Sequence, residues 1–288
     1  MSAMLEAPLH RRLGQWHYRR MTSAPLVLTI AGSEATGGAG AQADLRTFQA
    51  HDVFGMVALT CIVSFDPKAD WGHRFVPVEP QVISDQLEAI TTAYPPEQLS
   101  TVKLGMLGTP ATIETVAGAL QQRRFQHVVV DPVLICKGQE PGAALDTDTA
   151  LRAKILPLAT FVTPNHFETE SLSGMQVSTV EELTEAARRI YETSGAIVLA
   201  KGGVRLAGPD AVDVFYDGTT TELLTAPKVG EVPVAGAGCT LAAAVAARLA
   251  LGNSPLEAAR AAKEFVTAGI TDRLTSQAPF DVVRQQAV

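Results

Sequence analysis

The residue whose type and position best suit a catalytic role is Cys239. It follows Gly236-Ala237-Gly238, at the point where an alanine-rich helix is predicted to begin. The first N–H groups of a helix have no intrahelical partner, and the helix dipole adds positive potential there. We therefore expect the N–H groups of Ala237, Gly238 and Cys239 to form an anion site. The same field is expected to lower the pKa of the thiol and favour thiolate.

The alternative for Cys239 is a structural role, because free cysteine is a common core residue. Its place in the turn, rather than on the apolar stripe of the helix, favours chemistry. A proton acceptor beside a phosphate cradle is what phosphoryl transfer to an alcohol needs.

Two further stretches carry carboxylates. Asp131 ends the apolar run of "VVVDPVLICKG", where a carboxylate is more often a metal or phosphate-site residue than a structural one. Asn165 and Glu168, in "TPNHFETE", are three apart at a predicted helix start, so they fall on one face and can converge on a hydrated cation. A simple helix cap with a solvated glutamate explains this second pattern equally well.

A second glycine-rich stretch, "AGSEATGGAGAQADL", precedes the predicted helix that contains Asp44. Gly37, Gly38 and Gly40 would let the backbone approach a ligand closely. The spacing is not GxGxxG, so this pattern alone is weak.

The elements that must position these residues alternate along the chain. Short β-branched runs of strand length ("PLVLTIAG", "GMVALTCIVSF", "TVKLGML", "HVVVDPVLI", "TFVTP", "GAIVLAKGG") are separated by helical stretches. This pattern predicts a mostly parallel sheet flanked by helices on both faces, with chemistry at the carboxyl ends of the strands. Asp217-Gly218, between two alternating runs, predicts a late β-hairpin. We expect one α/β domain over residues 21–288.

Three helix starts are marked by capping residues. Thr109-Pro110 offers an N-cap followed by proline in the first turn. Ser178 with Glu181, and Ser254-Pro255 with Glu257, have the spacing of capping boxes.

Composition narrows the class of protein. The chain has 288 residues, of which 47% are hydrophobic and 18% charged, so a large core is expected. The net charge of −7 argues against nucleic-acid binding, and no apolar run approaches the roughly 20 residues that span a bilayer. Three dispersed cysteines, without a CxxC pair, predict neither a disulfide framework nor a zinc site and suit the cytoplasm.

Residues 1–20 differ from the rest, because they carry four arginines and one glutamate. An organelle transit peptide is one interpretation. We expect instead a disordered leader, or an upstream start codon with Met21 as the true beginning.

Taken together, "TIAGSEATGGAGAQADL", "KLGML", "VVDPV", "TPNHFE", "KGG" and "GAGCT" resemble the ribokinase superfamily. They are most similar to its branch of hydroxymethylpyrimidine kinases and related bacterial pyridoxal kinases, over nearly the whole chain from about Leu26. The resemblance implies a ribokinase-like fold with a small lid over the substrate.

The resemblance also implies roles for individual residues. Cys239 matches the catalytic base, and the neighbouring N–H groups of Gly236, Ala237 and Gly238 match the anion hole. The other implied positions are Asp131 and Glu168 for Mg²⁺ and phosphate, Asn165, Lys201, Gly202 and Gly203 for the nucleotide, and Asp44, Phe65, Met106 and Val133 for the substrate pocket.

Two positions separate the branches. Pyrimidine kinases typically have glutamine at the position of Phe65, and "AKSG" where this chain has "CKG". At both positions this chain resembles the pyridoxal kinase branch. In that branch a lid thiol, which matches Cys136, adds to the pyridoxal aldehyde. The chain departs from the family at Glu34, where aspartate is common, and at Ala235, where histidine is common.

The resemblance thus implies ATP-dependent phosphorylation of the 5′-hydroxymethyl group of pyridoxal, and of pyridoxine and pyridoxamine, by a cytoplasmic homodimer. Mg²⁺ is the expected metal, and a monovalent cation is possible. One alternative is a hydroxymethylpyrimidine (phosphate) kinase. The others are a non-catalytic vitamer-binding protein, which Cys239 argues against, and a dinucleotide oxidoreductase, disfavoured because GxGxxG is missing.

Overall fold

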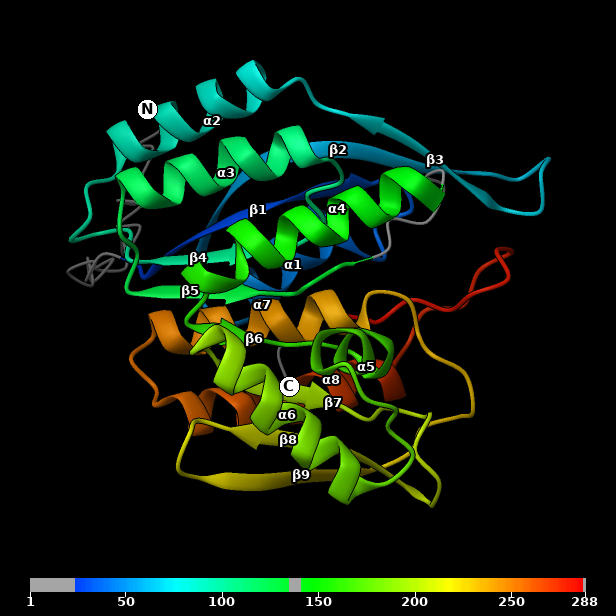
Figure 1. Cartoon of the computed structure of the whole chain (residues 1–288). Helices are drawn as coiled ribbons and strands as arrows, with labels where there is room; N and C mark the ends of the chain where they lie inside the picture. The colour runs from blue at the N-terminus through cyan, green and yellow to red at the C-terminus, as the bar shows by residue number, and fades with distance from the viewer. Residues whose placement is uncertain (1–23, 135–140, 287–288) are drawn as a thin grey trace, which may run out of the picture.

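The computed structural model of the chain describes residues 24–134 and 141–286, so Cys136 and the leader at residues 1–20 lie outside the described residues. Within these ranges the strands form one sheet with the order β3-β2-β1-β4-β5-β6-β7-β8-β9 (Figure 1). The strands are β1 (Leu26–Glu34), β2 (Phe54–Asp66), β3 (Gly72–Pro77), β4 (Thr101–Leu104), β5 (His127–Val130), β6 (Phe161–Val162), β7 (Ile197–Lys201), β8 (Asp210–Tyr216) and β9 (Thr221–Pro227).

The centre of this sheet, from β2 to β7, is parallel, and β3, β8 and β9 add antiparallel pairs at its edges. The predicted mostly parallel sheet is therefore confirmed. The predicted hairpin is β8–β9. Its connection is held by Asp217 Oδ1, which accepts the N–H groups of Thr219 at 3.0 Å and Thr220 at 2.7 Å.

Helices cover both faces of the sheet. They are α1 (Gly40–Ala50), α2 (Pro80–Ala93), α3 (Pro110–Gln122), α4 (Pro141–Lys154), α5 (His166–Ser173), α6 (Val180–Ser194), α7 (Ala237–Ala250) and α8 (Pro255–Thr271). One buried cluster joins the sheet to α2, α3, α4 and α6, and a second joins it to α1, α7 and α8. Leu28 belongs to the first cluster and Val27 to the second, because successive side chains of a strand point to opposite faces. Burial on both faces explains the near-continuous apolar runs.

The β2–β3 hairpin, whose loop extends beyond the helical layers in Figure 1, was not predicted from the sequence. Only one apolar run was assigned to this region, because β3 ("GHRFVP") is mostly exposed and carries charge. Phe65 lies on this hairpin opposite His73, and its ring also contacts Phe280 from the segment after α8.

Two of the three predicted helix starts are confirmed: Thr109 caps α3, and Ser254 with Glu257 forms the capping box of α8. The pairing of Ser178 with Glu181 is wrong. The capping box of α6 is instead Thr179 with Glu182, one residue later. Both pairs have the required spacing, so the register of the helix, which buries Leu183, decides between them.

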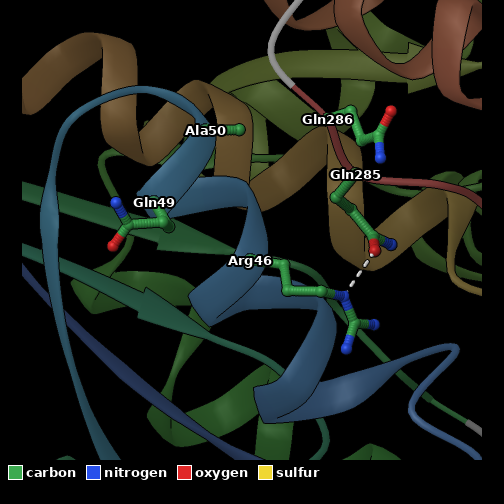
Figure 2. Close-up of a pocket in the computed structure, with 5 residues that line it drawn as sticks. All are labelled: Arg46, Gln49, Ala50, Gln285 and Gln286. Carbon is green, nitrogen blue, oxygen red and sulfur yellow. Dashed lines mark hydrogen bonds between the residues drawn. The ribbon is translucent and has the colours of Figure 1, made fainter.

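The segment after α8 returns to the start of α7. Val282 forms a bridge with Ala235, whose N–H donates to Asp281 O at 2.9 Å and whose carbonyl accepts from Val283 N at 3.0 Å. Further along, Gln285 accepts a hydrogen bond from Arg46 Nε of α1 at 2.9 Å, beside a shallow hollow (Figure 2). The segment therefore joins α1 to the stretch that precedes the glycine turn of α7. None of the helices described is long and apolar enough to cross a membrane.

Candidate active site

A pocket of about 620 Å³ opens beside the N-terminus of α7. Its wall includes most of the residues singled out from the sequence: Asp131, Val133, Asn165, Glu168, Lys201, Gly202, Gly203, Gly236, Ala237, Gly238 and Cys239. These residues come from the ends of β5, β6 and β7 and from the turn that begins α7. The structure therefore brings the predicted phosphate, metal and nucleotide positions into one cavity.

The turn at 236–239 has the backbone geometry expected of an anion site. Gly236 is the N-cap of α7 with φ 81°, and a Cβ at this position would overlap the carbonyl oxygen of Gly38, so glycine is required on both counts. The Ala237 N–H is directed back to Val234 O at 3.3 Å. One of the three expected donors is thus engaged within the chain, which leaves Gly238 and Cys239 as the better-placed donors.

The predicted lowering of the Cys239 pKa is wrong for the ligand-free protein. Burial raises the pKa of the thiol to about 11; Lys103 opposes this shift, while Asp131 and Asp44 add to it. A weaker contribution that favours thiolate is the hydrogen bond from the Gly40 N–H to the sulfur. Desolvation and two nearby carboxylates therefore favour the protonated thiol, contrary to the thiolate expected from the helix start.

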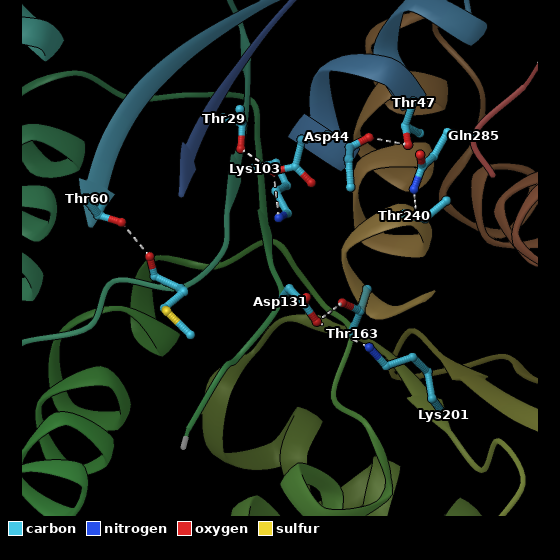
Figure 3. A network of polar contacts seen from close by, with 12 residues as sticks. Thr29, Asp44, Thr47, Thr60, Lys103, Asp131, Thr163, Lys201, Thr240 and Gln285 are labelled. Carbon is cyan, nitrogen blue, oxygen red and sulfur yellow. Dashed lines mark hydrogen bonds and ion pairs between the residues drawn. The ribbon is translucent and has the colours of Figure 1, made fainter. Parts of the chain in front are cut away.

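Asp131 and Lys201 lie next to Gly238 of the turn, and Figure 3 shows their side chains directed toward each other. Lys201 Nζ is 3.2 Å from Asp131 Oδ1, and Thr163 Oγ1 donates to the same oxygen at 3.3 Å. A Cβ at Gly238 would be 3.2 Å from Lys201 Nζ, so glycine keeps the backbone close to this ion pair. The pair places one positive and one negative charge at the floor of the anion site.

Glu168 is buried beside Asp131, and the simpler sequence interpretation of it is partly right. Asn165 and Glu168 form the capping box of α5, as the simpler interpretation held. The glutamate is not solvated, however, since only 5% of it is exposed. Burial and the charge of Asp131 raise the pKa of Glu168 to about 8, against the opposing effect of Lys201. Two carboxylates thus share one corner of the pocket.

Asp44 lies outside the pocket wall, in a fully buried ion pair with Lys103 (Figure 3). The Lys103 Nζ is 2.9 Å from Asp44 Oδ2, which also accepts from Thr29 Oγ1 at 2.6 Å. Burial raises the pKa of Asp44. Burial lowers the pKa of Lys103, but Asp44 together with Cys239 and Asp131 outweighs this effect, so the pKa of Lys103 is raised. The other Asp44 oxygen, Oδ1, has no hydrogen-bond partner in the described structure.

Lys103 was missed from the sequence. Its signal is a single charged residue inside the buried run "TVKLGML", which is expensive unless the charge is paired. A second missed pair is Asp213 with Lys263, joined at 2.8 Å; Asp213 also accepts the Gly202 N–H at 3.1 Å and so holds the "KGG" turn.

The remaining predicted substrate positions do not line this pocket. The carbonyl of Met106 accepts from Thr60 Oγ1 at 2.6 Å near the end of β4. The Phe65 ring lies 4.6 Å from His73 and 4.9 Å from Phe280, measured between ring centroids. Their contact with substrate, like that of Cys136, stays a prediction.

Comparison with known proteins places this geometry in a family. The family model described as phosphomethylpyrimidine kinase matches residues 34–282. The chain belongs to this family. Within it, the chain is 44% identical to the pyridoxine kinase of Bacillus subtilis over 246 residues, which cover 85% of this chain and 90% of that protein.

Two other relatives show how the family divides. The structure of the Staphylococcus aureus pyridoxal kinase in complex with AMP-PCP and pyridoxal superposes with a TM-score of 0.83 at 38% identity, covering 92% of this chain and 94% of that one. The hydroxymethylpyrimidine/phosphomethylpyrimidine kinase of Synechococcus elongatus is 39% identical, covering 88% of this chain and 94% of that protein. The ribokinase-like fold and the kinase class expected from the resemblance are confirmed, and the oxidoreductase alternative is set aside.

Proposed function

We propose that this protein is an ATP-dependent pyridoxal kinase, which transfers the γ-phosphoryl group to the 5′-hydroxymethyl oxygen of pyridoxal. The observation that carries the proposal is the thiol of Cys239 at an open backbone turn, directly above the Asp131–Lys201 pair. The pyridoxine and pyridoxal kinases among its relatives support the choice of substrate.

In the proposed mechanism the thiolate form of Cys239, which is the minor form in the ligand-free protein, takes the proton of the substrate alcohol. At the same time the alcohol oxygen bonds to the γ-phosphorus, and the bond between that phosphorus and ADP breaks. The N–H groups of Gly238 and Cys239 stabilise the charge of the transferring group. Lys201, which Asp131 holds under the turn, adds a positive charge at the same point. Asn165, Gly202 and Gly203, on the pocket wall, contact the nucleotide in this proposal.

Mg²⁺ fits the donor set at Asp131 and Glu168. In the described part of the chain no group of three or more His, Cys, Asp or Glu side chains could hold a metal. Mg²⁺, however, is commonly held by only one or two carboxylates together with phosphate oxygens and water. Burial, and after it the charge of Asp131, raise the pKa of Glu168, so a cation between these two carboxylates would be favoured. When bound, the ion would neutralise phosphate charge, and Asp131 and Glu168 would hold it.

The proposed vitamer-binding residues are assigned from the resemblance to the family. Asp44, with its free oxygen, is proposed to face the vitamer together with Met106, Val133 and the apolar Phe65. Cys136 is proposed to add to the pyridoxal aldehyde as a hemithioacetal. Pyridoxine has no aldehyde, so Cys136→Ser should lower the kcat/KM of pyridoxal relative to that of pyridoxine; an unchanged ratio removes the covalent role.

One experiment tests the proposed substrate. ATP consumption is measured with pyridoxal, pyridoxine, pyridoxamine and hydroxymethylpyrimidine side by side, and pyridoxal should have the highest kcat/KM. A higher value for hydroxymethylpyrimidine would replace the proposal with the second candidate, which the Synechococcus elongatus relative favours. No ATP consumption with any of them would leave a vitamer-binding protein.

We also propose that the protein is a cytoplasmic homodimer, as the resemblance implies. The β2–β3 hairpin pairs Ile62 with Val76, and these side chains are 43% and 59% exposed. An apolar pair of this kind on a projecting hairpin suits a second copy of the chain. Light scattering should give a dimer mass, and Ile62→Lys should lower it to that of a monomer.

A further inference from the structure

Glu34, the last residue of β1, organises the glycine-rich turn that leads into α1. Its side chain is buried, and its carboxylate accepts four hydrogen bonds from residues 36–39. The donors are Thr36 N at 2.5 Å, Thr36 Oγ1 at 2.8 Å, Gly38 N at 2.9 Å and Ala39 N at 3.2 Å. A carboxylate suits this place because it only accepts hydrogen bonds, and its charge is favoured at the N-terminus of α1.

The turn held by Glu34 contacts the turn at 236–239, called the catalytic turn below, at two points. The carbonyl oxygen of Gly38 lies against the Cα of Gly236, where a Cβ could not fit. The N–H of Gly40 donates a hydrogen bond to the sulfur of Cys239. Any movement of the turn at 36–40 therefore changes both the N-cap of α7 and the surroundings of the thiol.

The same turn is also fixed from its other sides. A Cβ at Gly40 would overlap Gly32 O of β1, and one at Gly38 would lie 2.5 Å from Val282 Cγ1. Val282 is the bridge partner of Ala235, which directly precedes Gly236. The turn at 36–40 thus packs between β1 and the segment that holds the catalytic turn. The Glu34 carboxylate lies at the centre of the turn at 36–40.

From these contacts we infer that Glu34 is a positioning residue for phosphoryl transfer, which acts through the turn at 36–40 to hold Cys239 and the α7 N–H groups in place. It does not need to touch either substrate. Loss of Glu34 should therefore slow the chemical step and leave the ground-state binding of the substrates nearly unchanged.

The test compares Glu34→Gln, Glu34→Asp and the wild type, with the matched control Glu182→Gln. Glu182 also accepts two backbone N–H groups, from Ser178 at 2.7 Å and Thr179 at 3.1 Å, but it lies outside the pocket wall. We expect kcat to fall about 100-fold in Glu34→Gln, the size of effect that small misplacements of reacting groups can have. The KM values for ATP and the acceptor should stay within about threefold. Glu34→Asp, which keeps the charge, should restore part of the lost kcat.

Several outcomes would overturn the inference. One is a kcat within about threefold of wild type in folded Glu34→Gln, since that leaves Glu34 with no catalytic effect. Another is a rise in KM at unchanged kcat, which indicates a binding role. A third is an equal loss of kcat in the Glu182→Gln control. If Glu34→Gln does not fold, Glu34→Asp decides: a lower kcat at unchanged KM supports the inference, and a normal kcat overturns it.

The assay depends on the proposed function, so the wild type is first tested with the four acceptors described above. If hydroxymethylpyrimidine is the better acceptor, only the proposed substrate fails, and the Glu34 series is measured with that acceptor. If none of the four acceptors turns over, the proposed function and the Glu34 inference both fail.

Discussion

Two glycine-rich turns in this protein look alike in sequence and differ in what they bind. "GGAGAQ" leads into α1 and "GAGCT" leads into α7, and each ends a connection at the start of a helix. In the first turn, backbone N–H groups donate hydrogen bonds to the carboxylate of Glu34. The second turn forms part of the wall of the large pocket.

The difference shows that glycine spacing alone does not identify a ligand site. Gly38 and Gly40 were expected to bring the backbone close to a ligand, but the neighbours they approach are Val282 and Gly32 of the same chain. What distinguishes the turns is whether the chain supplies its own anion. Among the described residues, no carboxylate fills the α7 turn in this way, and the turn lies next to Lys201, so it suits an anion from outside.

The largest effect in this comparison is expected from Cys239→Ala. The substitution leaves the glycine turn and its N–H groups in place but removes the proposed base. A positioned general base raises the rate by a factor of about 10²–10⁴, so kcat should fall by a factor within or beyond this range. Nucleotide affinity should be retained. Single-turnover kinetics and nucleotide titration measure the two quantities. Near-normal turnover would make Cys239 a packing residue.

The contact between the two turns is tested by Gly236→Ala. Alanine there is penalised twice, by φ 81° and by overlap with Gly38 O. The matched control is Gly174→Ala at the end of α5, where φ is 68° but, apart from its chain neighbours, no described residue lies within 4 Å of the added Cβ. The control should lose about 1–3 kcal/mol of unfolding free energy, and Gly236→Ala should lose clearly more. Denaturant unfolding of both variants measures the difference; equal losses would show that the turns are not in firm contact.

A smaller effect concerns thiol reactivity in the ligand-free protein. Burial raises the pKa of Cys239 to about 11, so the thiol is protonated at neutral pH, and its thiolate fraction increases about tenfold per pH unit below that value. The rate of Cys239 alkylation, followed by peptide mass spectrometry, should therefore rise steadily from pH 7 to 9. Cys61 is the control: its pKa is also raised to about 11, but it is fully buried and should react more slowly. A rate for Cys239 that is constant above pH 7 would contradict the raised pKa.

The smallest effect is expected from removal of residues 1–20. A chain that begins at Met21 lacks the arginine-rich leader, which lies outside the α/β pattern, so its melting temperature and kcat should equal those of the full chain. A marked decrease in either quantity would show that the leader packs on the folded protein.

Much of the fold and the pocket could be predicted from the sequence because local patterns encode them. Apolar runs buried on both faces gave the parallel sheet, and its strand ends placed Asp131 and Lys201 in one pocket. Lys103 and Glu34 could not be assigned in the same way, because their partners are set by tertiary packing. The error in the Cys239 pKa has the same origin: the sequence reveals the helix start, but not the burial or the carboxylates around the thiol.

The bridge between Ala235 and Val282 has a consequence for how the enzyme is made. Ribosomes synthesise Cys239 and every other predicted site residue before residues 281–283, which hold the stretch ahead of the catalytic turn. A nascent chain therefore carries the complete set of catalytic side chains before it can fix them in place. Activity should appear late in translation, and a premature stop codon shortly before residue 281 should release a protein that contains the site but not its support.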